Sequence, residues 1–280
     1  MIGFRSIRFR ARKVTALKED RWIAVTAGVG SANFEGAALR VKESLDKSKV
    51  FDKVVAVLTQ DLKELCPITT GIYSDYLRTD VHGYGFMCWK AEIVKAALDG
   101  KWGSFDGVIW IDAGCEVSIN PASTVRLKYF KRFARKHGVA SFALKTNEIQ
   151  YTKRDLFALF PSIDPKSAGA QIQTTWILFY GKLGRTIANE WLDLVAKGAN
   201  LLDFSPSVLP EFPEFIQNRN DQSAFSLVCK KNQVKIMRYI PTAGTGSLTA
   251  NFRGLFHPFW TTRNRTSKSV KKQFHHYFEV

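Results

Sequence analysis

The chain has 280 residues and a formal net charge of +16 at pH 7, and 45% of its residues are hydrophobic. A chain of this length and composition can bury a sizeable core. No apolar run approaches the roughly 18 residues that span a bilayer, and no apolar segment follows the basic N-terminus, so we expect neither a membrane span nor a secretory signal. The four cysteines form no CxxC pair, which argues against zinc-ribbon and redox motifs and favours reduced thiols in a cytosolic protein.

The positive charge is concentrated at both ends of the chain and on one predicted helix. Residues 1–21 carry seven Lys or Arg against two acidic residues, and residues 261–280 carry five against one. Six more basic residues lie between positions 122 and 136, namely Arg126, Lys128, Lys131, Arg132, Arg135 and Lys136. These groups are either solvated faces or contacts for an anionic partner. Membrane lipids, nucleic acids and phosphate-rich substrates all offer the same charge to Lys and Arg.

The first 60 residues predict a β-α-β unit. Residues 21–27 form an apolar run typical of a strand, and residues 28–31 form a glycine-containing loop that allows close backbone approach. A helix is predicted over residues 34–48, because Ala37, Ala38, Val41 and Leu45 recur at helical spacing. Residues 50–58 predict a second buried strand. This order is typical of a parallel sheet with a right-handed crossover.

Helices and strands continue to alternate along the rest of the chain. Residues 84–98 place Phe86, Trp89, Ile93 and Ala97 on one face, which predicts a helix. The further predicted elements are a strand ending near residue 111, a helix over 122–136, strands over 139–144 and 172–180, a helix over 184–197, a proline-punctuated loop over 204–215, a short helix from about 221 to 228, and a strand over 235–240.

The most informative segment is the apolar run over residues 108–111, which ends abruptly at Asp112. Two small residues, Ala113 and Gly114, come next, and a second acidic residue, Glu116, follows Cys115. Ligands of open α/β sheets bind at the carboxyl ends of the strands, so Asp112 should lie at the rim of a crevice. A carboxylate flanked by small residues suits a divalent cation that holds a phosphorylated ligand. The alternative is that Asp112 only caps the turn after the strand.

Four segments together resemble glycosyltransferases of the GT-A type. They are the N-terminal β-α-β unit with Thr26 near its first strand end, the aromatic segment at 83–90 that ends in Trp89 and Lys90, the segment at 110–116, and the Asp221-Gln222 pair. The segment at 83–90 is similar to one found in a group of uncharacterised bacterial and viral glycosyltransferase-like proteins. The segment at 110–116 resembles that group's version of the metal-binding DxD motif. The order of the four segments matches that group, and together they cover roughly residues 21–240.

The resemblance implies a Mn²⁺ or Mg²⁺ site, but this sequence departs from the usual DxD motif. Its third position is Gly114 instead of an acid. Either Glu116 supplies the second carboxylate, or Asp112 holds the cation through water, or the protein works without metal. A late histidine often completes the site in retaining relatives, and His257 is the candidate here. A lone histidine is more often a structural residue.

The resemblance also implies roles for the other motif residues in transferring a sugar from a nucleotide sugar to an acceptor hydroxyl. Thr26, Gly28, Trp89, Lys90, Asp112, Ala113 and Gly114 would form the donor site. Lys90 would add positive charge for the leaving diphosphate, with Trp89 anchoring its helix. Asp221 would be the general base of an inverting enzyme. In a retaining enzyme Gln222 would stabilise the anomeric carbon and Asp221 would position the sugar. The structural alternative is that Asp221 only caps a helix.

The predicted fold class is α/β, a single Rossmann-like GT-A domain with a mostly parallel central sheet flanked by helices. We expect a basic N-terminal extension over residues 1–20, the glycosyltransferase-like domain over 21–262 and a basic tail over 263–280. The predicted location is cytoplasmic, with peripheral attachment to the inner face of the membrane as one option. The acceptor is a glycan, a lipid-linked glycan or a modified DNA base.

Two other functions are consistent with parts of the sequence. A nucleic-acid-binding protein without catalysis would use the basic ends and nearby aromatic residues, but the basic stretches match no common nucleic-acid motif. A nucleotidyltransferase would also hold a diphosphate with metal-bound carboxylates. It more often has a glycine-rich basic loop near its N-terminus, and residues 27–33 do not supply one.

Overall fold

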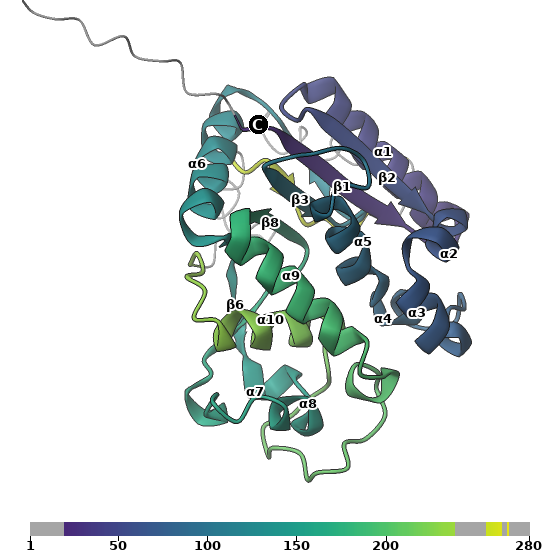
Figure 1. Ribbon diagram of the computed structural model, residues 1–280, viewed down its shortest axis with the longest axis vertical. Coiled ribbons are helices and arrows are strands. Elements are labelled where there is room, and N and C mark those ends of the chain that lie inside the picture. The colour runs from purple at the N-terminus through teal and green to yellow at the C-terminus, as the bar shows by residue number, and fades with distance from the viewer. Residues whose placement is uncertain (1–19, 239–255, 265–267, 269–280) are drawn as a thin grey trace, which may run out of the picture.

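A five-stranded β-sheet forms the centre of the molecule (Figure 1). The computed structural model describes residues 20–238, 256–264 and 268. The strand order is β2-β1-β3-β8-β5. Strand β1 pairs in parallel with β2 and β3, whereas β8 is antiparallel to both β3 and β5, so four of the five strands run in one direction. The predicted α/β class, with a mostly parallel sheet flanked by helices, is confirmed. The strands are β1 (Trp22–Gly28), β2 (Lys53–Leu58), β3 (Gly107–Ile111), β8 (Trp176–Tyr180) and β5 (Val139–Ala140).

Helices cover both faces of this sheet. On one face, Trp22 and Ala24 of β1 belong to the core cluster that includes side chains of α1 (Ala32–Ser48) and α6 (Pro121–His137). On the other face, Ile23 and Val25 belong to the cluster that includes side chains of α5 (Trp89–Leu98) and α9 (Gly181–Val195). Because both faces are covered, every residue of β1 is buried. This burial explains why the strand reads as a continuous apolar run rather than an alternating one.

The predicted β-α-β unit at the start of the chain is present, and local contacts explain its geometry. Helix α1 is capped by Ser31, whose hydroxyl accepts a hydrogen bond from the Phe34 amide at 3.4 Å. Strand β1 approaches this first turn so closely that a Cβ at Gly28 would lie 1.9 Å from the Phe34 carbonyl oxygen. Glycine is therefore required at position 28 for packing alone.

Four predicted elements are wrong in part. The strands predicted over 139–144 and 172–180 are each interrupted, and their two halves belong to different sheets. The helix predicted over 84–98 begins only at Trp89, because residues 83–87 all have positive φ, between 50° and 85°. The strand predicted over 235–240 is not formed in its described part, where Met237 makes one isolated bridge to Phe142. Positions 239 and 240 lie outside the described residues. Apolar spacing indicated these elements, but it carries no information on the sign of φ or on which partner strand is available.

A second group of elements lies below α9 in the view of Figure 1 and carries helix α10 (Asp221–Lys231). It contains the small sheet formed by β6 (Ala143–Asn147) and β7 (Ala170–Ile172). A separate two-stranded sheet joins β4 to β9. The remaining elements are β4 (Glu116–Val117), β9 (Phe259–Trp260), α2 (Leu62–Leu65), α3 (Pro67–Ile72), α4 (Gly83–Phe86), α7 (Glu148–Tyr151) and α8 (Arg154–Ala158), with short 3-10 turns at Thr59–Asp61, Ser74–Tyr76, Pro165–Ser167 and Ala199–Leu201.

The predicted terminal extensions fall largely outside the described residues. Of the extension over 1–20, only Asp20 is described. At the other end, the Asn264 amide donates to the Gly114 carbonyl at 3.0 Å, so this part of the predicted tail packs on the domain. Within the described part of the chain, no helix has the length and apolar character required to cross a membrane.

Candidate functional site

Polar side chains gather at the edge of the sheet where the parallel strands end. Asp112 directly follows β3, and its amide donates to the Thr175 carbonyl at 2.8 Å. Because β8 is antiparallel to β3, the residues just before β8, including Thr174, reach the same edge. The carboxyl edge of parallel strands is the usual position of a ligand crevice in α/β folds.

Lys90 lies at the centre of this site and joins two acidic residues that are distant in the sequence. Its Nζ is 3.1 Å from Oδ1 of Asp112 and 2.9 Å from Oδ2 of Asp221. It also donates to the Thr174 hydroxyl at 3.4 Å. The Lys90 side chain is 1% exposed and that of Asp221 is 5% exposed, whereas the Asp112 side chain is 29% exposed. Asp112 is therefore the member of the trio that faces solvent.

The electrostatics of the trio keep Lys90 protonated. Burial disfavours the ammonium form, but Asp112 and Asp221 more than offset this penalty, so the pKa of Lys90 lies above its ordinary value. Burial raises the pKa of Asp221 above its ordinary value, Lys90 opposes the rise, and the charge of Asp112 adds to it. A buried carboxyl with a raised pKa at a sheet edge is typical of a functional group.

A left-handed turn fixes the start of the helix that carries Lys90. Residues 83–87 all adopt positive φ, including the non-glycine residues Tyr84, Phe86 and Met87. The indole of Trp89 donates to the carbonyls of Gly83 and Tyr84, at 3.3 and 3.0 Å. Left-handed backbone costs about 1 kcal/mol or more for each non-glycine residue, and such strain tends to be kept at functional sites. Trp89 thus anchors the turn, and Lys90, the next residue, reaches the two carboxylates.

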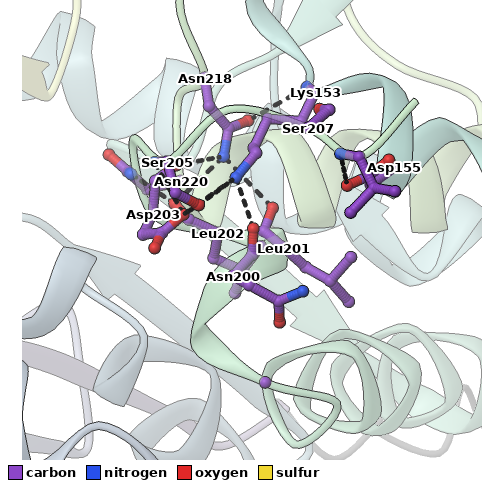
Figure 2. A network of polar contacts seen from close by, with 12 residues as sticks. Lys153, Asp155, Asn200, Leu201, Leu202, Asp203, Ser205, Ser207, Asn218 and Asn220 are labelled. Carbon is purple, nitrogen blue, oxygen red and sulfur yellow. Dashed lines mark hydrogen bonds and ion pairs between the residues drawn. The ribbon is translucent and has the colours of Figure 1, made fainter. Parts of the chain in front are cut away.

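A second strained residue sets the position of Asp221. Asn220 immediately precedes α10 with φ 50° and ψ −122°, and its side-chain amide donates to the Leu202 carbonyl at 2.5 Å. The loop that Asn220 contacts is itself held by the buried Lys153, which binds the Asp203 carboxylate at 2.9 Å and the Ser205 hydroxyl at 3.0 Å (Figure 2). The polar network of Figure 2 therefore holds the segment from which α10 and Asp221 begin.

Gln222, the residue after Asp221, is held by a second polar network. Its side-chain amide donates to Oε1 of Gln171 at 2.7 Å, and Arg219 donates to the same oxygen at 3.5 Å. The guanidinium of Arg219 stacks on the ring of Tyr151, with 3.8 Å between its central carbon and the ring centroid. Gln222 is half-buried, so its amide is fixed by the protein but still reached by solvent.

The remaining residues expected at the donor site occupy the strand ends around this trio. Thr26 is fully buried, and its hydroxyl has no hydrogen-bond partner among the described residues. The Ala113 carbonyl accepts from the buried Arg40 at 2.8 Å. Gly114 is covered by the C-terminal segment, because a Cβ there would lie 3.4 Å from Cα of Arg263. Gly28 packs against α1, as described above.

The three residues expected to bind a metal do not converge. Glu116 forms an ion pair with Arg40 at 3.1 Å and accepts from the Asn264 amide group at 2.7 Å. His257 lies among the rings of Phe130, Trp176 and other aromatic residues. Over residues 20–238, 256–264 and 268, no group of three or more His, Cys, Asp or Glu side chains is placed to hold a metal ion. Asp112, Glu116 and His257 therefore do not form the three-ligand metal centre that the resemblance implies.

The surroundings of His257 predict a pH-dependent stability. Burial lowers the pKa of His257 to about 3, while a backbone contact with Phe259 opposes the shift. Below pH of about 6.5 the unfolded chain takes up a proton that the folded protein rejects. Stability is therefore complete above that pH and declines as the pH falls, by up to about 1.4 kcal/mol per pH unit. Between pH 7 and 5, urea denaturation should show a loss about 2 kcal/mol larger in the wild type than in His257→Asn. Equal losses in both proteins would contradict this assignment.

Several residues of the site have no motif of their own in the sequence. Thr174 lies in a predicted strand, Gln171 and Arg219 lie between predicted elements, and Arg263 contributes only to the charge of the predicted basic tail. Arg219 directly precedes the Asn220-Asp221-Gln222 segment, and this proximity was the one available signal. The other three become neighbours only through the antiparallel insertion of β8 and the return of the chain after β9.

The chain is similar to several solved structures at low sequence identity. No protein-family model and no curated protein sequence matches the chain. A glycosyltransferase involved in the glycosylation of the major capsid of PBCV-1 is 13% identical, with a TM-score of 0.47 over 91% of this chain and 99% of that one. Mouse xyloside xylosyltransferase 1 is 12% identical, with a TM-score of 0.43 over 88% and 99%. The bifunctional glycosyltransferase WbbM is 10% identical, with a TM-score of 0.45 over 86% of this chain and 45% of that one.

Proposed function

We propose that the protein is a nucleotide-sugar-dependent glycosyltransferase that transfers a sugar from a nucleoside-diphosphate sugar to an acceptor hydroxyl. The observation that carries this proposal is the buried Lys90, which joins Asp112 and Asp221 at the carboxyl edge of the sheet. A protein that only bound nucleic acid would gain nothing from burying a cation between two acids at this edge. The sequence resemblance to GT-A enzymes supports the same function, and it rests in part on the same three residues.

The proposed reaction gives each residue of the trio a role. The acceptor oxygen forms a bond to the anomeric carbon while the bond from that carbon to the diphosphate oxygen breaks. The electron pair of the broken bond stays on the diphosphate, and the acceptor proton passes to a base. Asp112, as the exposed member, would contact the donor, and Lys90 would hold Asp112 and Asp221 in position.

Asp221 and Gln222 remain the proposed catalytic pair, and their roles depend on the stereochemistry. In an inverting reaction Asp221 takes the acceptor proton, for which its raised pKa is suited. In a retaining reaction Gln222, fixed by Gln171, would place its amide beside the anomeric carbon while Asp221 positions the sugar. Ala113, Gly114, Thr26, Gly28 and Trp89 would shape the donor site.

We also propose that the acceptor or its carrier is anionic. Helix α6 contains six basic and no acidic residues, and Lys128, Arg132 and Lys136 are exposed on it. Attachment of a cytoplasmic protein to an anionic membrane surface, or binding of DNA, would use such a helix. Binding to phosphatidylserine vesicles and to DNA, each followed across a salt series, separates the two. An equally weak interaction with both at low salt would contradict an anionic acceptor.

Thermal-shift measurements test the proposed function directly. Nucleoside diphosphates and nucleotide sugars should raise the melting temperature, because a ligand that binds only the folded state stabilises it. The measurement is made with EDTA and again with Mn²⁺, and the nucleotide that stabilises is then used in a transfer assay. The absence of any shift across the set of nucleotides would overturn the proposal.

A further inference from the structure

We infer that Arg219 and Arg263 form a binding site for the departing diphosphate and that these side chains, instead of a resident metal ion, carry its charge. The inference rests on the proposed function and names the part of the donor that the site would hold. It starts from two guanidinium groups that the sequence did not single out and that the catalytic roles above do not use.

The backbones of the two arginines belong to segments that adjoin the acidic trio, in different parts of the chain. Arg219 lies two residues before Asp221. Arg263 has φ 55° and lies against Gly114, which follows Asp112 by two residues. The segment around Arg263 is pinned, because the Gly114 carbonyl accepts from the Thr262 hydroxyl at 3.2 Å and from the Asn264 amide at 3.0 Å. Since Lys90 joins Asp112 to Asp221, both arginines are tied to the same edge of the sheet.

Neither guanidinium forms an ion pair with a described acid. Among the described residues, no carboxylate oxygen lies within 4.0 Å of either group. The hydrogen bonds of Arg219 go to the neutral oxygens of Thr146 and Gln171. Burial lowers the pKa of Arg219 and the positive charge of Arg263 adds to this shift, whereas Tyr151 and Glu148 oppose it. Two guanidinium groups without an ion pair are a favourable receptor for phosphate oxygens.

The net charge at the carboxyl edge of the central sheet also disfavours the binding of a divalent cation. Lys90 already neutralises one of the two carboxylates that a metal would need, and the expected ligand Glu116 is bound to Arg40. With both arginines counted, the five charged side chains at this edge carry a net positive charge. Such an edge repels a dication and attracts a diphosphate.

Calorimetric titration with inorganic pyrophosphate at low ionic strength tests the inference without requiring transfer. Wild-type protein should bind pyrophosphate equally well in EDTA and in Mn²⁺. Arg219→Gln and Arg263→Gln should each weaken binding by about tenfold, the usual effect of losing a hydrogen bond to a charged group. Lys182→Gln removes one positive charge from an exposed position on α9, outside every site proposed here, and should change binding less than about twofold.

Two results would overturn the inference. One is binding that requires Mn²⁺, and the other is wild-type affinity in both Arg219→Gln and Arg263→Gln. Neither result contradicts the proposed glycosyltransferase function if nucleotide sugars stabilise the protein and sugar transfer is detected. Conversely, metal-free pyrophosphate binding that both variants weaken supports the site even where no nucleotide sugar is turned over.

Discussion

Lys90→Met should abolish sugar transfer and lower the free energy of unfolding by about 3–5 kcal/mol. The substitution removes the cation that lies 3.1 Å from Asp112 and 2.9 Å from Asp221, and it leaves two carboxylates facing each other at a largely buried position. Their repulsion should shift both side chains, and preorganised charge of this kind is worth about a hundredfold or more in kcat. Denaturation and transfer assays, with the rate expressed per folded molecule, measure the two effects separately.

A control on the same helix separates loss of function from loss of stability. Glu92 is also buried on α5, but its carboxylate accepts from the Ile68 and Thr69 amides at 3.0 Å, away from the trio. Glu92→Met should destabilise the protein and leave the rate per folded molecule within about threefold of wild type. Equal loss of rate in Lys90→Met and Glu92→Met would mean that Lys90 only supports the fold.

A double variant keeps the prediction testable if Lys90→Met does not fold. Lys90→Met combined with Asp221→Asn removes one of the two repelling charges, so part of the lost stability should return. Transfer should remain absent, because neither the cation nor the second carboxylate is present. Recovery of transfer in the double variant would contradict the proposed roles of both residues.

The sequence was sufficient to predict the strands that position the site and two of its charged residues, Asp112 and Lys90. The apolar runs at residues 21–27 and 108–111 predicted buried strands, and the abrupt change at Asp112 placed a carboxylate at their edge. Lys90 was assigned to the same crevice from its place after Trp89. These features are local, and local patterns of hydrophobicity and charge are what sequence reasoning can use.

The parts that could not be predicted depend on contacts between distant segments. Glu116 and His257 were reasonable metal ligands by type, but no pattern shows that Arg40 binds the first and that aromatic rings enclose the second. The left-handed turn at 83–87 was hidden by apolar residues that continue the helical spacing of α5. Arg263 lies beside Gly114 only because the chain returns to that loop after β9.

Asp221→Asn should reduce transfer by at least about a hundredfold, the range for loss of a general base, while leaving the fold and donor binding nearly intact. Asparagine has the shape of aspartate, and Lys90 keeps its ion pair with Asp112 in the variant. The carbonyl of residue 221 still accepts from the Trp191 indole at 3.1 Å, which holds the start of α10. Transfer rates, melting temperature and nucleotide affinity are compared with those of Asp193→Asn, an exposed aspartate on α9.

The pH profile distinguishes a base from a purely positioning residue. If Asp221 accepts the acceptor proton, the wild-type rate should fall at low pH with an apparent pKa above that of an ordinary aspartate, because burial raises the pKa of this carboxyl. The residual rate of Asp221→Asn should lack that acidic limb. A missing limb in the wild type, together with retention of anomeric configuration measured by NMR, would assign the chemistry to Gln222 and leave Asp221 to position the sugar. Wild-type turnover in Asp221→Asn would exclude both roles, because an uncharged amide can neither take the proton nor maintain the second ion pair of Lys90.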